Sequence, residues 1–100
     1  MPHPRHGLDA AFQTPLRLSL MAALGREEID FGALRDALET SDSQLSKAIG
    51  ALEQPGYVTV RKGHLGSRPR TWITATLRGR RAFERHLAAL AEIGRGYSGS

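Results

Sequence analysis

The sequence predicts a single, mainly α-helical domain that carries a small β-hairpin (α+β), with the element order α-β-α-α-β-β-α. Three observations lead to this prediction. The 100 residues fit one domain, and a chain of this size can bury about two-thirds of its unfolded surface in one core. Apolar residues recur at helical spacing in four segments. Between the third and fourth segments, two runs rich in β-branched residues flank a tip that contains Gly and Pro, which is typical of a hairpin.

The first helix is expected from Pro15 to Leu24. Thr14 is a candidate N-cap, Pro15 occupies the first helical position, and Gly25 is a stop signal. The helix is apolar on two opposite sides, made by Leu16, Leu20 and Leu24 and by Leu18, Met21 and Ala22. Either the domain itself covers both sides, or a second copy of the chain covers one. In so short a chain we favour the second copy.

A helix-turn-helix unit is expected next. Residues 29–31 form a short extended piece, residues 32–39 the second helix and residues 43–54 the third, with capping side chains at residues 40–42. The third helix turns Leu45, Ile49 and Leu52 to one side. Its opposite side is small, polar and singly basic, as a surface that enters a DNA groove requires.

Pro55-Gly56 ends the third helix, and the strands Tyr57–Arg61 and Arg70–Thr76 follow, separated by a Gly- and Arg-rich tip. A helix followed directly by a hairpin with a basic tip is the layout of a winged helix, in which one element enters a DNA groove and the other follows the backbone. We expect Trp72 to pack against the helices, because a lone aromatic residue in a strand is more often core than a stacking platform.

The last helix is capped by Thr76 and carries an apolar stripe of Phe83, Leu87, Leu90 and Ile93. Residues 94–100 are rich in Gly and Ser, and residues 1–7 carry no periodic pattern. We therefore expect mobile ends at 1–7 and 94–100, and one winged-helix domain over 8–93.

Charge is segregated along the chain. Up to Glu53 there are five Lys/Arg against eight Asp/Glu, a net charge of −3, and from Gln54 onward nine against two, a net charge of +7. No acidic residue lies between Gln54 and Phe83. A one-sided field of this kind attracts a polyanion, although a charge run can also be only a solvated surface.

Several classes of function are not expected. The chain has no cysteine, so it has no disulfide and no thiolate metal site, and no apolar run is long enough to span a bilayer. The first residues lack the apolar core of a signal peptide, so a cytoplasmic, nucleoid-associated protein is expected. His3 and His6 could supply two ligands to a metal ion, but no third ligand is nearby. No P-loop or GxGxxG motif occurs, and no histidine has a nucleophile or carboxylate placed to act with it in catalysis. We expect no metal, no cofactor and no enzymatic activity.

The element order resembles that of the small MarR-like winged-helix transcriptional regulators. The resemblance covers residues 8–93 and is carried by the runs 45–47, 52–58, 66–72 and 76–83, the last being similar to the LTxxGRxxF junction of that family. It implies that the protein binds DNA as a homodimer and that the first and last helices form the contact between the two copies. Two departures stand out: Pro55 replaces a common alanine, and Gly50 and Ala51 leave the second half of the third helix without long side chains.

The candidate contacts follow from this layout. Gln44 can pair with an adenine edge and Lys47 with guanine or phosphate, while Arg68 suits the minor groove. The residues expected to contact DNA are Ser41, Ser43, Gln44, Lys47, Arg61, Lys62, Arg68 and Arg70. Those expected in the dimer interface are Leu18, Met21, Ala22, Leu87 and Leu90. A small-molecule effector is conceivable at the dimer contact, but no polar constellation in the sequence supports one.

The leading hypothesis is a homodimeric regulator that reads double-stranded DNA and represses a promoter. A winged helix used for protein–protein contact is the alternative, because this fold hosts both uses. A third reading is an architectural protein that binds nucleic acid without sequence preference, since the face of the third helix is poor in base-reading side chains. Salt dependence separates the first two hypotheses.

Overall fold

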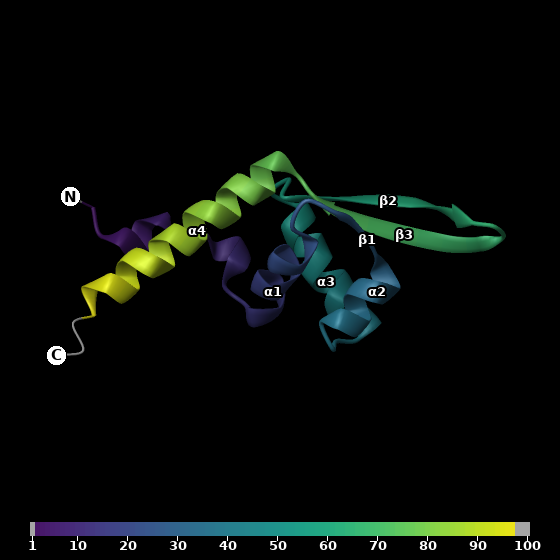
Figure 1. Cartoon of the computed structure of the whole chain (residues 1–100), viewed down its shortest axis with the longest axis horizontal. Helices are drawn as coiled ribbons and strands as arrows, with labels where there is room; N and C mark the ends of the chain where they lie inside the picture. Colours follow the sequence, from purple (N-terminus) through teal and green to yellow (C-terminus); the bar gives the residue numbers. More distant parts are fainter. Residues whose placement is uncertain (1, 98–100) are drawn as a thin grey trace.

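The chain folds into a helical body from which a long hairpin projects (Figure 1). The computed structural model describes residues 2–97. Its elements are two 3-10 helices, η1 (Pro4–Gly7) and η2 (Ala10–Phe12), followed by α1 (Pro15–Leu24), β1 (Glu28–Asp30), α2 (Phe31–Ala37), α3 (Asp42–Glu53), β2 (Val58–Leu65), β3 (Arg68–Ala75) and α4 (Leu77–Gly96). From α1 onward this is the predicted order α-β-α-α-β-β-α, and the winged-helix fold is confirmed.

Side-chain caps determine where the four α-helices begin. The side-chain oxygens of Thr14, Asp30, Ser41 and Thr76 each accept a hydrogen bond from a backbone N–H three residues ahead, at 2.9–3.2 Å. Such a bond satisfies a donor that has no partner inside the helix. Because Asp30 caps α2, that helix begins at Phe31 rather than Gly32, and β1 ends one residue earlier than predicted.

The sheet has the strand order β1-β3-β2, and both pairings are antiparallel. Ile29 and Val60 lie opposite Ile73 on the face that covers the core. Trp72 lies on the other face, opposite Asp30 and Arg61. The prediction that Trp72 packs against the helices is therefore wrong, because alternation along β3 gives the core position to Ile73.

We call residues 58–75 the wing. Its strands are longer than predicted and meet at Gly66-Ser67, where Gly66 has a φ of 65°. Leu65 pairs directly with Arg68, so the tip is a two-residue hairpin turn rather than a longer loop. Such turns require a positive φ, which glycine adopts at no steric cost.

Both apolar sides of helix α1 pack at least partly against its own chain, and Ala22 is left exposed. Leu20 and Leu24 are fully buried and Met21 is only 2% exposed, while Leu16 and Leu18 pack against the same core. α1 contacts α3, β3, α4 and η2. The expectation that a second copy covers one face is therefore not needed to explain the pattern, and Met21 is corrected from a dimer contact to a core residue.

The N-terminal segment lies against α4. The Asp9 N–H donates to Nδ1 of the buried His86 at 2.9 Å, and a Cβ built on Gly7 would lie 3.1 Å from that of Ala89. Phe12, 2% exposed, contacts the rings of Tyr57, Phe83 and His86 at centroid distances of 5.3–5.4 Å. Thus residues 4–7, expected to be mobile, have a defined packing partner. Residues 94–96 continue α4, and residues 98–100 lie outside the described range.

Candidate nucleic-acid interface

Helix α3 presents a small polar surface to solvent. Leu45, Ile49 and Leu52 anchor it in the core, which leaves Ser43, Gln44, Lys47 and Gly50 exposed on the opposite side. A Cβ built on Gly50 meets no atom within 4 Å, so the backbone of α3 is open to close approach there. This surface has the size and polarity of an element that enters the major groove.

The start of α3 is tied to α2. Arg35 Nη1 lies 2.8 Å from Asp42 Oδ1, and the Thr40 hydroxyl donates to Gln44 Oε1 at 2.9 Å. Ser41, one of the residues expected to contact DNA, caps α3 by accepting the Gln44 N–H at its Oγ. Arg35 forms ion pairs with both Asp42 and Asp36, and these raise its pKa above the ordinary value of arginine. These contacts link the end of α2 to the start of α3.

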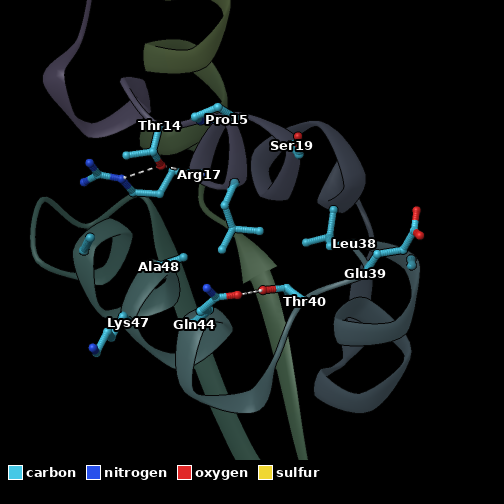
Figure 2. Close-up of a pocket in the computed structure, with 13 residues that line it drawn as sticks. Thr14, Pro15, Arg17, Ser19, Leu38, Glu39, Thr40, Gln44, Lys47 and Ala48 are labelled. Atoms are coloured by element: carbon cyan, nitrogen blue, oxygen red, sulfur yellow. Dashed lines mark hydrogen bonds between the residues drawn. The ribbon is translucent and has the colours of Figure 1, made fainter.

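An open groove of about 820 Å³ runs beside this surface, between the start of α1, the end of α2 and one edge of α3 (Figure 2). Gln44 and Lys47 line it from α3, and Thr14 and Arg17 line it from α1. The Arg17 Nε donates to Thr14 Oγ1 at 3.1 Å. Arg17 was not predicted as a candidate contact, because only the packing of α1 against α3 places it in the same groove as Lys47.

The cations of the wing fall into two sets. Arg61 donates from Nη2 and Nε to the two carboxylate oxygens of Glu28, at 2.7 and 3.0 Å, and Arg70 Nη1 lies 3.0 Å from Asp30 Oδ1. Within residues 2–97, Lys62 and Arg68 are exposed and have no carboxylate partner. Of the four wing residues proposed to contact DNA, two are thus already paired within the chain.

Both carboxylates of β1 are stabilised in their charged form. The hydrogen bond from Arg61 lowers the pKa of Glu28, and the same pair raises the pKa of Arg61. The hydrogen bond from the Ala33 backbone N–H lowers the pKa of Asp30 most, and the hydrogen bond from Arg70 lowers it further. Both carboxylates are therefore charged at neutral pH, as the two ion pairs require. Sequence reasoning missed Glu28 and Asp30, because their role depends on β1 joining the sheet beside β3.

Helix α4 presents two of the residues proposed for a dimer contact. Leu87 and Leu90 are 42% and 41% exposed, and they lie one turn apart on the helix. Ala22 is exposed on α1, Leu18 is half-buried and Met21 is buried. The exposed apolar surface of the proposed contact therefore lies mainly on α4.

Neither a metal-binding cluster nor a membrane-spanning helix is found among residues 2–97. Residues 2–97 contain no group of three His, Cys, Asp or Glu side chains placed to hold a metal ion. His3, from the H-x-x-H pair, accepts the Arg5 N–H at 3.1 Å and caps η1. None of the described helices is long and apolar enough to cross a membrane.

A helix-turn-helix unit joined to a three-stranded sheet with a basic hairpin defines a winged-helix DNA-binding protein. The family model described as "Winged helix DNA-binding domain" matches residues 16–93, and the chain belongs to this family. The uncharacterized protein MJ0432 of Methanocaldococcus jannaschii is 29% identical over 83 residues, which cover 82% of this chain and 90% of that protein.

Solved structures of transcriptional regulators share the fold of this chain. A transcriptional regulator homologue from Pyrococcus horikoshii OT3 superposes with a TM-score of 0.85 at 26% identity, covering 98% of this chain and 99% of that one. A MarR-family regulator from Rhodococcus sp. RHA1 superposes with a TM-score of 0.69 at 21% identity, over 97% of this chain and 69% of that one. The predicted resemblance is confirmed: the chain carries a winged-helix DNA-binding domain and shares its fold with these regulators.

Proposed function

We propose that the protein represses transcription as a homodimer that reads double-stranded DNA, with α3 in the major groove and the wing on the minor groove and phosphates. The observation that carries this proposal is the juxtaposition of two features. The exposed side of α3 bears Gln44 and Lys47 without a large acidic side chain between them, and the wing bears Lys62 and Arg68 without a carboxylate partner within residues 2–97. Gln44 suits an adenine edge, and the three cations suit guanine or phosphate.

Fluorescence anisotropy with a labelled random-sequence duplex tests the general form of the proposal. Phosphate contacts release counterions, so we expect affinity to fall linearly on logarithmic axes from about 50 to about 300 mM salt, with a slope of about −0.9 per neutralised phosphate. Lys62→Ala and Arg68→Ala should each reduce that slope by about 0.9 per chain. Arg95→Ala is the matched control, because Arg95 pairs with Glu92 near the end of α4, away from the wing (Figure 1).

Sequence reading is tested by selecting duplexes from a random library with the wild-type chain and with Gln44→Ala. A base contact by Gln44 predicts an enriched site that loses its preference for adenine at one position in the variant. Identical enrichment in both proteins would exclude Gln44 from base reading. Absence of binding to any duplex at the lowest salt would refute DNA binding and favour a protein partner.

Sedimentation equilibrium tests the homodimer. We expect the wild-type chain to sediment as a dimer and Leu87→Glu/Leu90→Glu to sediment as a monomer, because two carboxylates would then have to be desolvated in the contact. Both side chains are more than two-fifths exposed in one chain, so the helical circular dichroism should stay unchanged. A wild-type chain that remains monomeric with and without DNA would contradict the dimer.

A further inference from the structure

The outer face of the sheet, which we define as the face carrying Glu28, Asp30, Arg61, Arg70 and Trp72, is built from two opposed charge pairs. Asp30, Trp72 and Arg61 form one row across β1, β3 and β2. The Glu28 carboxylate binds Arg61 through both of its oxygens, in the fork geometry that fixes a guanidinium most firmly. Arg70 is held by Asp30, which β1 presents on the same face.

Trp72 fixes the position of Arg61 further. The guanidinium carbon of Arg61 lies 4.1 Å from the centroid of the Trp72 ring, within the range of a cation–π contact. A Cβ built on Gly63 would lie 3.1 Å from the same ring, so the ring lies closely over the backbone of β2. Arg61 is therefore held between a carboxylate and an aromatic face, and its side chain does not sample the space around the wing freely.

The two pairs remain accessible to a competing anion. In the Arg61–Glu28 pair the side chains are 57% and 39% exposed, and in the Arg70–Asp30 pair 37% and 24%. Exposed ion pairs are weak and are screened by salt. While the pairs hold, however, Arg61 and Arg70 add almost no net charge to the wing, and the field that a polyanion meets comes from Lys62 and Arg68.

We propose that Glu28 and Asp30 are specificity-determining residues that limit how many wing cations bind phosphate. The inference rests on the proposed contact of the wing with DNA. Non-specific affinity grows with each phosphate that is neutralised, whereas base contacts by α3 do not depend on the wing. Withdrawing Arg61 and Arg70 into pairs with β1 therefore lowers binding to arbitrary DNA and leaves base reading intact, which raises the ratio of specific to non-specific affinity.

The test compares Glu28→Gln with Glu27→Gln. Glu27 is exposed and makes no ion pair within residues 2–97, so both variants add the same net charge and only the first releases Arg61. Glu28→Gln should steepen the salt slope on a random-sequence duplex by about 0.9 per chain and raise affinity at about 0.1 M salt about eightfold per added contact. Adding Arg61→Ala to Glu28→Gln should return the slope to the wild-type value.

The outcomes separate this inference from the proposed function. Equal slopes for Glu28→Gln and Glu27→Gln, with a wild-type chain that binds DNA, would refute the inference alone. Weaker binding by Glu28→Gln would also refute it, because Glu28 would then be orienting Arg61 toward phosphate. A wild-type chain that binds no duplex would refute both. Asp30→Asn provides a second variant that keeps an acceptor for the Ala33 N–H and should steepen the slope in the same way.

Discussion

Replacing Gly79 by alanine should destabilise the protein, although the same change in most helices is stabilising. Gly79 is buried in the first turn of α4, where its N–H donates to the capping Thr76 hydroxyl. A Cβ at this position would lie 2.8 Å from both the carbonyl carbon and the Cα of Tyr57, and closer still to the carbonyl oxygen. Real Cβ atoms essentially never approach backbone so closely, so Tyr57 or α4 must move.

The magnitude follows from two opposing effects. Alanine gains about 0.5–1 kcal/mol over glycine inside a helix, because the unfolded chain loses less conformational freedom. Forcing a methyl group against closely packed neighbours costs about 1–3 kcal/mol, and here the neighbour is backbone that also accepts the Thr76 N–H at 2.9 Å. The difference between the two effects is a net loss of about 1 kcal/mol, so we expect a melting temperature lower by about 4–8 °C.

Thermal unfolding followed by circular dichroism measures this loss, with Gly50→Ala as the matched control. A Cβ on Gly50 meets open space in the middle of α3, so that variant should gain about 0.5–1 kcal/mol and melt about 2–8 °C higher. If Gly79→Ala melted at or above the wild-type temperature, the contact between α4 and Tyr57 would not be as close as described. If Gly50→Ala were also less stable, helix propensity would not govern that position.

Two further predictions concern the packing of the N-terminal segment. Phe12→Ala should lower the free energy of unfolding by about 3–5 kcal/mol, because Phe12 is buried among three aromatic rings, and a melting temperature within a few degrees of wild type would contradict this. The Tyr57 hydroxyl donates to Asp9 Oδ2 at 2.5 Å, and this bond, with burial, raises the pKa of Tyr57 above its ordinary value of 10.0. The bond therefore stabilises the fold below pH 10.0 and is lost as the pH rises through the raised value. Tyr57→Phe should be less stable by about 1 kcal/mol at neutral pH and should show a smaller alkaline decline in denaturant titrations, whereas parallel alkaline curves would exclude this bond as the cause.

Local signals predicted the elements whose ends are set by local chemistry. Thr14-Pro15 and Gly25 give the bounds of α1 without reference to the rest of the chain. The wing is longer than its β-branched pattern indicated, because Gly63, His64 and Leu65 are held by the ladder to β3 rather than by their own propensities. The two 3-10 helices carry no periodic signal. Packing against α4 holds η1 in place, and the ring contacts of Phe12 hold η2.

The candidate site was predictable only in part, because pairing partners come from distant segments. Lys62 and Arg68 are exposed wing cations, as their place in a basic tip indicated. Arg61 and Arg70 carry the same sequence signal, yet β1 supplies each with a carboxylate across the sheet. Only the strand order β1-β3-β2 brings these carboxylates beside Arg61 and Arg70 and so distinguishes paired from unpaired wing cations. Counts of charged residues do not predict that order. Trp72 was predicted to face the helices and Met21 to face a second copy of the chain, and both predictions were wrong. In each case the sequence pattern allowed either side of the strand or helix to face the core.

Strand β1 pairs its backbone only with the base of the wing, and beyond that the Asp30–Arg70 ion pair ties it to the start of the outer part. β1 pairs with β3 as far as Trp72, and beyond it the pairs from Lys62–Thr71 to Leu65–Arg68 form a two-stranded ribbon without a buried residue. A two-stranded hairpin is marginally stable in water, so the ribbon opens at a much smaller free energy than the core. Its amide protons should exchange with solvent before those of β1. The outer wing can therefore bend to follow a curved surface, while the helix-turn-helix unit keeps its shape.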